Sequence, residues 1–178
     1  MQTLVIKVGT QTLTTADGLL NHAILQTWVA QIAALKRRGD FVVLVTSGAV
    51  GTGRGLLKQP TPPSGAGITA SIINERQILA AIGQAHLMQA YQHVLDNHGL
   101  RGAQILLTKQ DFITKHHYQN IAHLFQALRQ QEAIVPIVNE NDSVAIQELM
   151  FTDNDELAGL LAAQLGADRL LLLTNVAG

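Results

Sequence analysis

The chain has 178 residues, of which 47% are apolar and 14% are charged, and its formal net charge at pH 7 is −1. This composition excludes a disordered chain and predicts one soluble globular domain. Lysine and arginine number 12 against 13 aspartates and glutamates, and only 4% of the residues are aromatic. Nucleic acid is therefore excluded as the main partner, because neither a basic excess nor a set of stacking side chains is present.

The absence of cysteine excludes disulfides, thiolate metal sites and a cysteine nucleophile. No apolar run reaches the roughly 18 residues that a membrane helix needs, so we expect no membrane partner. The opening sequence MQTLVIKVG has the character of a strand, since it lacks the charged segment and long apolar segment of a signal peptide. We therefore predict a cytoplasmic protein.

Short apolar runs rich in valine, isoleucine and leucine predict strands buried on both faces, as in a parallel sheet. Helical spacing of apolar residues fills the stretches between these runs. The alternation predicts an α/β fold: a doubly wound, mainly parallel sheet with helices on both faces. The predicted strands are Leu4–Val8, Phe41–Val45, Gln104–Leu107, Ile134–Val138 and Leu170–Leu173.

Two further segments interrupt the alternation of strands and helices. The segment Pro60–Gly67 is dense in turn formers and predicts a surface loop, whereas Ser143–Phe151 predicts a hairpin or a small strand pair.

Each predicted helix has one apolar stripe at helical spacing. The four stripes are Ile24, Trp28, Ile32 and Leu35; Ile78, Ile82, Ala85, Met88, Tyr91 and Leu95; Ile121, Leu124, Phe125 and Leu128; and Leu157, Leu160, Leu161 and Leu165.

Polar residues follow every predicted strand. In open parallel sheets ligands bind beyond the carboxyl ends of the strands, so this edge is the expected site. The clusters are Lys7 to Thr10, Thr46 to Gly53, Thr108 to Asp111, Asn139 to Asp142, and Thr174 with Asn175.

Lys7 lies in an otherwise apolar strand, where its ammonium group needs an anion, a carboxylate or a path to solvent. Lys7 is a candidate phosphate contact. The alternative is that its side chain extends from the end of the strand so that the ammonium group reaches solvent. Gly48, Gly51 and Gly53 would let the backbone approach an anion, although their spacing matches neither common phosphate-binding motif and a tight turn explains them equally well.

The residues from Asp153 to Glu156 form a capping box that predicts the start of the last helix. Capping leaves Asn154 and Asp155 unexplained. Asn154 could bind a ligand carboxylate at the first helical turn, and Asp155 could hold an ammonium group such as that of Lys7.

The seven histidines lack a metal-ligand spacing, and Ser47 lacks the surroundings of a hydrolase nucleophile, so we predict neither a protein-held metal nor a hydrolase.

Seven motifs occur together in one order: VIKVGT, VTSGAV, ILAAIGQ, QILLT, IVPIVNENDSVA, FTDNDELAGLLA and LLLLTNVAG. The set resembles the amino acid kinase family over essentially the whole chain, and NEND followed by DND resembles its glutamate 5-kinase (gamma-glutamyl kinase) branch. The resemblance implies ATP-dependent phosphorylation of the side-chain carboxylate of L-glutamate, giving L-glutamyl 5-phosphate, the first step of proline biosynthesis. ATP and Mg²⁺ are the implied cofactors, L-glutamate is the implied substrate, and a homo-oligomer is expected.

The resemblance also implies roles for individual residues. Lys7 would neutralise the transferring phosphoryl group, and Asp155 would orient Lys7. Asp142 would hold the α-ammonium group of glutamate, and Asn154 would contribute through its backbone or amide. The other implied contacts are Ser47, Gly48 and Ala49 to glutamate, Gly9 and Thr10 to the phosphates, and Thr174 and Asn175 to the nucleotide.

Three departures from the family pattern qualify these implications. Asn175 stands where the family usually has aspartate, and the connection from Gln59 to Asn74 is longer than usual. Family members continue beyond the equivalent of Gly178 into a half that binds most of the nucleotide. Residues 1–178 are therefore expected to be an amino acid kinase domain truncated before that half. A non-catalytic glutamate-binding module and a family member with another substrate remain the alternatives.

Overall fold

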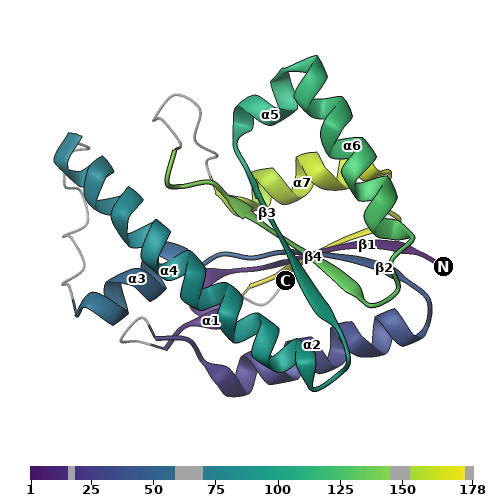
Figure 1. Cartoon of the computed structure of the whole chain (residues 1–178), viewed down its shortest axis with the longest axis horizontal. Helices are drawn as coiled ribbons and strands as arrows, with labels where there is room; N and C mark the ends of the chain where they lie inside the picture. The colour runs from purple at the N-terminus through teal and green to yellow at the C-terminus, as the bar shows by residue number, and fades with distance from the viewer. Residues whose placement is uncertain (16–18, 59–69, 145–152, 175–178) are drawn as a thin grey trace.

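The structure is a computed structural model that describes residues 1–15, 19–58, 70–144 and 153–174. Its centre is a five-stranded, all-parallel sheet with the strand order β3-β4-β2-β1-β5 (Figure 1). The five predicted strands are confirmed, although β3 begins at Arg101 and β4 continues to Glu140. The strands are β1 (Thr3–Val8), β2 (Phe41–Val45), β3 (Arg101–Leu107), β4 (Ile134–Glu140) and β5 (Arg169–Leu173).

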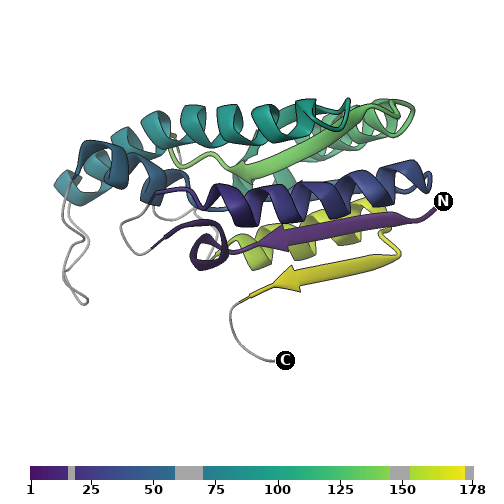
Figure 2. The ribbon, with the colours of Figure 1, turned by 90° about the horizontal axis from the view of Figure 1, so that it is seen from below.

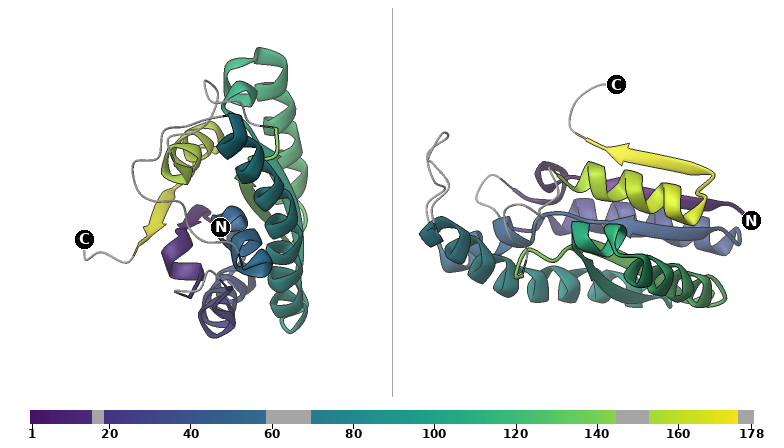
Figure 3. Two further views of the ribbon diagram at one scale, coloured as in Figure 1. Left: turned by 90° about the vertical axis from the view of Figure 1, so that its left-hand side faces the viewer. Right: turned by 90° about the horizontal axis from the view of Figure 1, so that it is seen from above.

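Helices cover both faces of the sheet, which confirms the predicted α/β architecture. α2 and α4 contribute to an apolar cluster on one face, and α6 and α7 contribute to a second cluster on the other. Figure 1 and the left panel of Figure 3 show these two groups on opposite sides of the strands. The helices are α1 (Thr10–Leu13), α2 (His22–Arg37), α3 (Ala49–Leu57), α4 (Ala70–Asp96), α5 (Lys109–Ile113), α6 (Lys115–Arg129) and α7 (Asn154–Leu165).

The two edge strands differ from the prediction that every strand is buried on both faces, because only Ile105 and Leu107 of β3 are buried and β5 is largely exposed. β5 pairs with β1 and lies at one end of the strand order, so Leu170, Leu171 and Leu172 remain substantially exposed. Figure 2 shows β5 at this outer edge beside β1. The apolar run correctly predicted a strand, but it could not indicate whether a layer covers that strand.

The buried faces of the helices are also partly displaced from the predicted stripes. In α2 the fully buried positions include Leu25 and Val29, while Trp28 is only half-buried. In α4 the predicted Ile78 is 58% exposed, and its neighbour Leu79 is buried. The early part of α4 packs on α3, so tertiary contact selects a face that the 3.6-residue period alone does not specify. The remaining mismatches are Ile24, Leu35, Ile82, Ala85, Met88, Leu124, Leu160 and Leu165, which are half-buried or exposed.

Two predicted segments lie mainly outside the described residues. The loop Pro60–Gly67 falls wholly within residues 59–69, and the predicted hairpin Ser143–Phe151 overlaps residues 145–152. Of that hairpin only Ser143 and Val144 are described, and they lie in a turn after β4. Both segments therefore stay predictions.

The glycine cluster after β2 serves two structural purposes. Gly48 has a φ of 101° and caps the amino end of α3, a conformation that an L-residue with a side chain rarely adopts. Gly51 and Gly53 lie within α3 rather than in a loop. A Cβ on Gly53 would collide with the backbone of Leu79, and a Cβ on Gly83 would collide with the carbonyl oxygen of Ala49. Gly53 and Gly83 therefore let α3 and α4 approach closely.

We expect Gly83→Ala to lower the free energy of unfolding by about 2 kcal/mol or more, because the added methyl group forces α3 and α4 apart. Gly159→Ala is the matched control: a Cβ at Gly159 meets nothing within 4 Å, and the alanine should stabilise α7 by about 0.5–1 kcal/mol. Urea unfolding followed by circular dichroism measures both changes. Equal stability of the two variants would contradict the close-contact interpretation.

Candidate functional site

A pocket of about 530 Å³ opens where β2 and β4 end beside the amino ends of α3 and α7. This is the sheet edge at which the polar clusters were predicted to gather. Several predicted site residues from four separate stretches of the chain line it, which confirms that the fold brings them together. Those residues are Thr10, Ser47, Gly48, Ala49, Asp142 and Asn154.

Lys7 and Asp155 form an ion pair next to this pocket, with 2.5 Å between Nζ and Oδ1. Lys7 lies between Val45 of β2 and Leu172 of β5 in the sheet register, and its side chain is only 13% exposed. An ammonium group in such surroundings needs a carboxylate partner, and Asp155 supplies one from the first turn of α7. The predicted contact is therefore present, while its part in catalysis stays a prediction.

The side-chain nitrogen of Asn154 hydrogen-bonds to other parts of the protein. Its amide nitrogen donates to the carbonyl oxygen of Thr46 at 2.7 Å, to Oγ of Ser47 at 2.8 Å and to Oδ1 of Asn139 at 2.9 Å. These contacts fasten the start of α7 to the ends of β2 and β4. The amide nitrogen thus bonds within the protein, whereas the amide oxygen, Oδ1, is buried with no hydrogen-bond partner among the described residues. The predicted ligand contact, through the backbone or the amide of Asn154, stays a prediction.

A buried polar network continues from Asn139 into α4. The Asn139 amide nitrogen donates to Oε1 of Gln84 at 2.8 Å, and Oδ1 of Asn139 accepts from the backbone N–H of Glu140 at 3.0 Å. The hydroxyl groups of Thr46 and Tyr91 lie 2.9 Å apart, and burial raises the pKa of Tyr91 well above its ordinary value. Sequence reasoning missed Gln84 and Tyr91, because both fall on a mainly apolar helix face and nothing local indicates their partners.

Asp142 is paired with Arg76 in the pocket. Nε and Nη2 of Arg76 donate to the same oxygen of Asp142, Oδ1, at 3.3 and 2.9 Å. A second arginine, Arg54 of α3, pairs with Glu75 of α4 at 3.0 Å. Sequence reasoning missed both arginines and Glu75, since ion pairs between distant segments have no local signature.

The remaining predicted contacts lie around the end of β1. Gly9 caps the amino end of α1, and its backbone N–H donates to the carbonyl oxygen of Leu173 at 3.3 Å. Thr174 follows β5, outside the set of residues that line the pocket. Asn175 lies outside the described residues. The nucleotide contacts assigned to these residues stay predictions.

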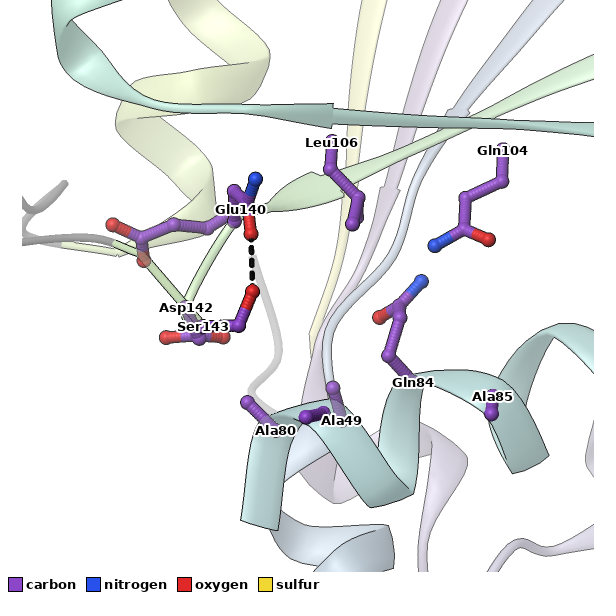
Figure 4. A pocket seen from close by; sticks show the side chains of 11 residues that line it. Ala49, Ala80, Gln84, Ala85, Gln104, Leu106, Glu140, Asp142 and Ser143 are labelled. Atoms are coloured by element: carbon purple, nitrogen blue, oxygen red, sulfur yellow. Dashed lines mark hydrogen bonds between the residues drawn. The ribbon is translucent and has the colours of Figure 1, made fainter. Parts of the chain in front are cut away.

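A second recess of about 260 Å³ lies between α4 and the ends of β3 and β4 (Figure 4). It shares Ala49, Glu140 and Asp142 with the larger pocket. Gln84 and Gln104 extend into it from opposite walls, and Nε2 of the buried Gln84 has no hydrogen-bond partner among the described residues. The recess thus adjoins the same polar network without forming a separate charged site.

The polar cluster after β3 is largely explained by helix capping. Thr108 and Asp111 form a capping box at the start of α5, and Lys109 pairs with Glu156 of α7 at 2.6 Å. Asp153 caps α7 by accepting from the backbone N–H groups of Asp155 and Glu156, so the predicted helix start is confirmed. The residues from Thr108 to Asp111 support the frame of the site without lining the pocket, whereas Asp153 lines it.

The residues that the structure describes include no group of three or more histidine, aspartate or glutamate side chains placed to hold a metal ion. Among them no helix is both long and apolar enough for a membrane span.

Comparison with known proteins places this geometry in a family. The family described as "Amino acid kinase family" matches residues 2–178. The chain belongs to the amino acid kinase family. Its glutamate 5-kinase relatives include proteins from Chlorobaculum tepidum, 51% identical over 98% of this chain; a Thermoanaerobacter species, 45% identical over 98%; and Neisseria gonorrhoeae, 43% identical over 97%. The aligned part is 46%, 45% and 56% of those relatives, so the chain spans about half the length of the curated relatives it matches.

We expect Asn154→Ala to destabilise this member of the amino acid kinase family by about 2–3 kcal/mol, because the buried Thr46 and Asn139 and the half-buried Ser47 lose one shared donor. Asn120→Ala is the matched control, since Asn120 on α6 is exposed and its side chain hydrogen-bonds to that of His116. Chemical unfolding of both variants measures the difference. A loss at Asn154 no greater than that at Asn120 would contradict the fastening role.

The acid sensitivity of the fold offers a further prediction. Burial opposes ionisation of Asp111, but hydrogen bonds from Thr108 and His117 outweigh it and lower the pKa below the ordinary 3.8. A lowered folded-state pKa stabilises the protein above pH 3.8, and that stabilisation is lost as pH falls through the lowered value. We expect Asp111→Asn to be less stable than the wild type at pH 7 and to approach it on acidification. A stability difference that stays constant from neutral to acidic pH would contradict this.

Proposed function

We propose that this chain forms the acceptor-binding part of an enzyme that transfers the γ-phosphoryl group of ATP to the side-chain carboxylate of L-glutamate. The product is L-glutamyl 5-phosphate, and the reaction is the first step of proline biosynthesis. Residues 1–178 would then be the glutamate-binding portion of an amino acid kinase domain. The names of relatives that are 43–51% identical support the substrate. The observation that carries the proposal is the Lys7–Asp155 pair beside a pocket of opposite charges.

The chemistry of the reaction suits that pair. A side-chain oxygen of glutamate forms a bond to the γ-phosphorus, the bond from that phosphorus to the bridging oxygen breaks, and ADP leaves. Phosphoryl transfer depends on positioning and on neutralising negative charge rather than on a covalent enzyme intermediate. Lys7 brings one positive charge to the end of β1, and Asp155 fixes the position of its Nζ atom.

The acceptor side of the pocket suits an amino acid. In our proposal Asp142 binds the α-ammonium group, while Ser47 and the backbone of Gly48 and Ala49 contact glutamate. Asn154 contributes through its backbone or its amide oxygen, because its side-chain nitrogen already contacts three protein acceptors, whereas Oδ1 has no partner among the described residues. Carboxylates and backbone N–H groups at helix starts are chemically suited to the two charges of an amino acid.

The nucleotide side is proposed with fewer contacts. Gly9 and Thr10 would lie near the phosphates, and Thr174 and Asn175 would begin the nucleotide site. Mg²⁺ would be held mainly by the phosphates of ATP, as in many kinase sites, because the described acidic residues do not form a three-ligand group. When bound with ATP, Mg²⁺ supplies further neutralisation of the phosphate charge. A cytoplasmic location and a homo-oligomer remain part of the proposal.

Replacement of Lys7 tests the proposal in the native-length protein that carries this chain. We expect Lys7→Met to lower kcat by about 10²–10³-fold, because the charge that stabilises the transferring group is lost. The affinity for L-glutamate should change little. Lys115→Met is the matched control, since Lys115 is exposed on α6 and away from the pocket. ADP release in a coupled assay measures turnover, and calorimetry measures glutamate binding.

Three outcomes would contradict the proposal at different levels. Retained turnover in Lys7→Met would rule out the role of Lys7. Glutamate binding by the wild type without any ADP release would instead indicate a non-catalytic binding module. Stabilisation by a different acceptor such as carbamate, but not by L-glutamate, would indicate another substrate within the family.

A further inference from the structure

We infer that Arg76 binds the α-carboxylate of the amino acid substrate, so that the Arg76–Asp142 ion pair opens to receive a zwitterionic head group. The inference rests on the proposed function and adds a specificity residue to it. Arg76 and Asp142 both line the pocket, and they come from segments that are 66 positions apart in the chain. They form a pair only because the fold brings α4 to the turn that follows β4.

The charge balance of the pocket creates the need for such a residue. Two arginines and four carboxylates line it, and a glutamate molecule would bring two more carboxylates. A carboxylate entering these surroundings is strongly disfavoured unless a cation pairs with it. Lys7 is assigned to the phosphoryl end of the reaction, so a cation that supplements the backbone N–H groups at the α-carboxylate would be one of the two arginines. The lining charges are Arg54, Arg76, Glu75, Glu140, Asp142 and Asp153.

Arg76 is better placed for this task than Arg54. The side chain of Arg54 is only 16% exposed, and it joins α3 to α4 through Glu75. The side chain of Arg76 is 48% exposed, so its guanidinium group can turn toward a ligand with little loss of solvation. Asp142 is the fixed member of its pair, because its side chain is only 10% exposed.

The geometry of the pair matches an α-amino acid. Nε and Nη2 of Arg76 both reach Oδ1 of Asp142, so the pair itself does not use Oδ2 or Nη1. An amino acid carries its ammonium and carboxylate groups on one carbon, and the wall of the pocket presents the complementary charges side by side. Opening the pair exchanges one internal ion pair for two contacts with the ligand, including a forked contact from the guanidinium group. Until a ligand binds, Arg76 and Asp142 neutralise each other.

The test uses the native-length protein and compares its binding of two ligands that differ by one charged group. 4-Aminobutyrate is L-glutamate without the α-carboxylate. We expect Arg76→Gln to weaken L-glutamate binding by about 10–100-fold, the loss expected for a charge-assisted contact, and to leave 4-aminobutyrate binding unchanged or tighter. Arg76→Lys should give an intermediate loss, because lysine keeps the charge without the planar fork. Arg101→Gln is the charge-matched control, since Arg101 pairs with Asp96 away from the pocket.

A second comparison covers the case in which 4-aminobutyrate binds the wild type too weakly to measure. Glutarate is L-glutamate without the α-ammonium group, and it is measured in an Asp142→Asn background so that no unpaired aspartate repels it. In that background Arg76→Gln should still weaken glutarate binding about 10-fold. Calorimetric titration gives all the dissociation constants.

The outcomes separate this inference from the proposed function. Equal losses for L-glutamate and 4-aminobutyrate, or no loss of glutarate binding in the Asp142→Asn background, would show that Arg76 only positions Asp142 and would overturn the inference. Unchanged L-glutamate binding in Arg76→Gln would overturn the inference while leaving the proposed function intact. A wild type that does not bind L-glutamate would overturn the proposed function, and the inference would fail with it.

Discussion

The fastening of three elements by the amide of Asn154 is the interaction on which the site depends. Where parallel strands end, their last carbonyl groups leave the sheet ladder and still need hydrogen-bond donors. Asn154 donates to the carbonyl of Thr46 and to the side chains of Ser47 and Asn139 at the ends of β2 and β4. This contact sets the position of the first turn of α7, and that turn places Asp155 against Lys7. A structural hydrogen-bond requirement therefore positions the charged pair.

The opposite wall of the pocket depends on close packing of two helices. Gly53 and Gly83 let the backbones of α3 and α4 approach, so that α4 passes directly over the start of α3. The same helix then brings Gln84 to the buried polar network and Arg76 to Asp142. A Cβ at either glycine would collide with the backbone of the other helix, so the position of α4 depends on both. Packing in this part of the fold thus determines which polar groups face the pocket.

The sequence was informative where a local pattern has one physical meaning. All five strands were predictable because their apolar runs are continuous, and the Lys7–Asp155 contact was predictable because an ammonium group in a buried strand requires a carboxylate. The hydrogen bonds from Asn154 to the strand ends were not predicted, since no sequence pattern shows which strand-end carbonyls lack donors. Arg76 was missed because its partner lies 66 positions away. The exposure of β5 depends on which layers surround the sheet, and the apolar run does not specify them.

The charges of the site share a common arrangement that links stability to binding. Six charged side chains of the site form three internal ion pairs, in which each charge neutralises the other. The pairs are Lys7–Asp155, Arg54–Glu75 and Arg76–Asp142. An unpaired charge in such surroundings would destabilise the empty protein, so pairing lets the fold carry many charged groups at its sheet edge. A charged ligand then gains affinity only by offering a better partner than the internal one. Such exchange favours ligands whose charges match the spacing of a pair, and it disfavours ligands that carry only one of the two charges. Selectivity for an amino acid head group can therefore arise from the same ion pairs that stabilise the pocket when it is empty.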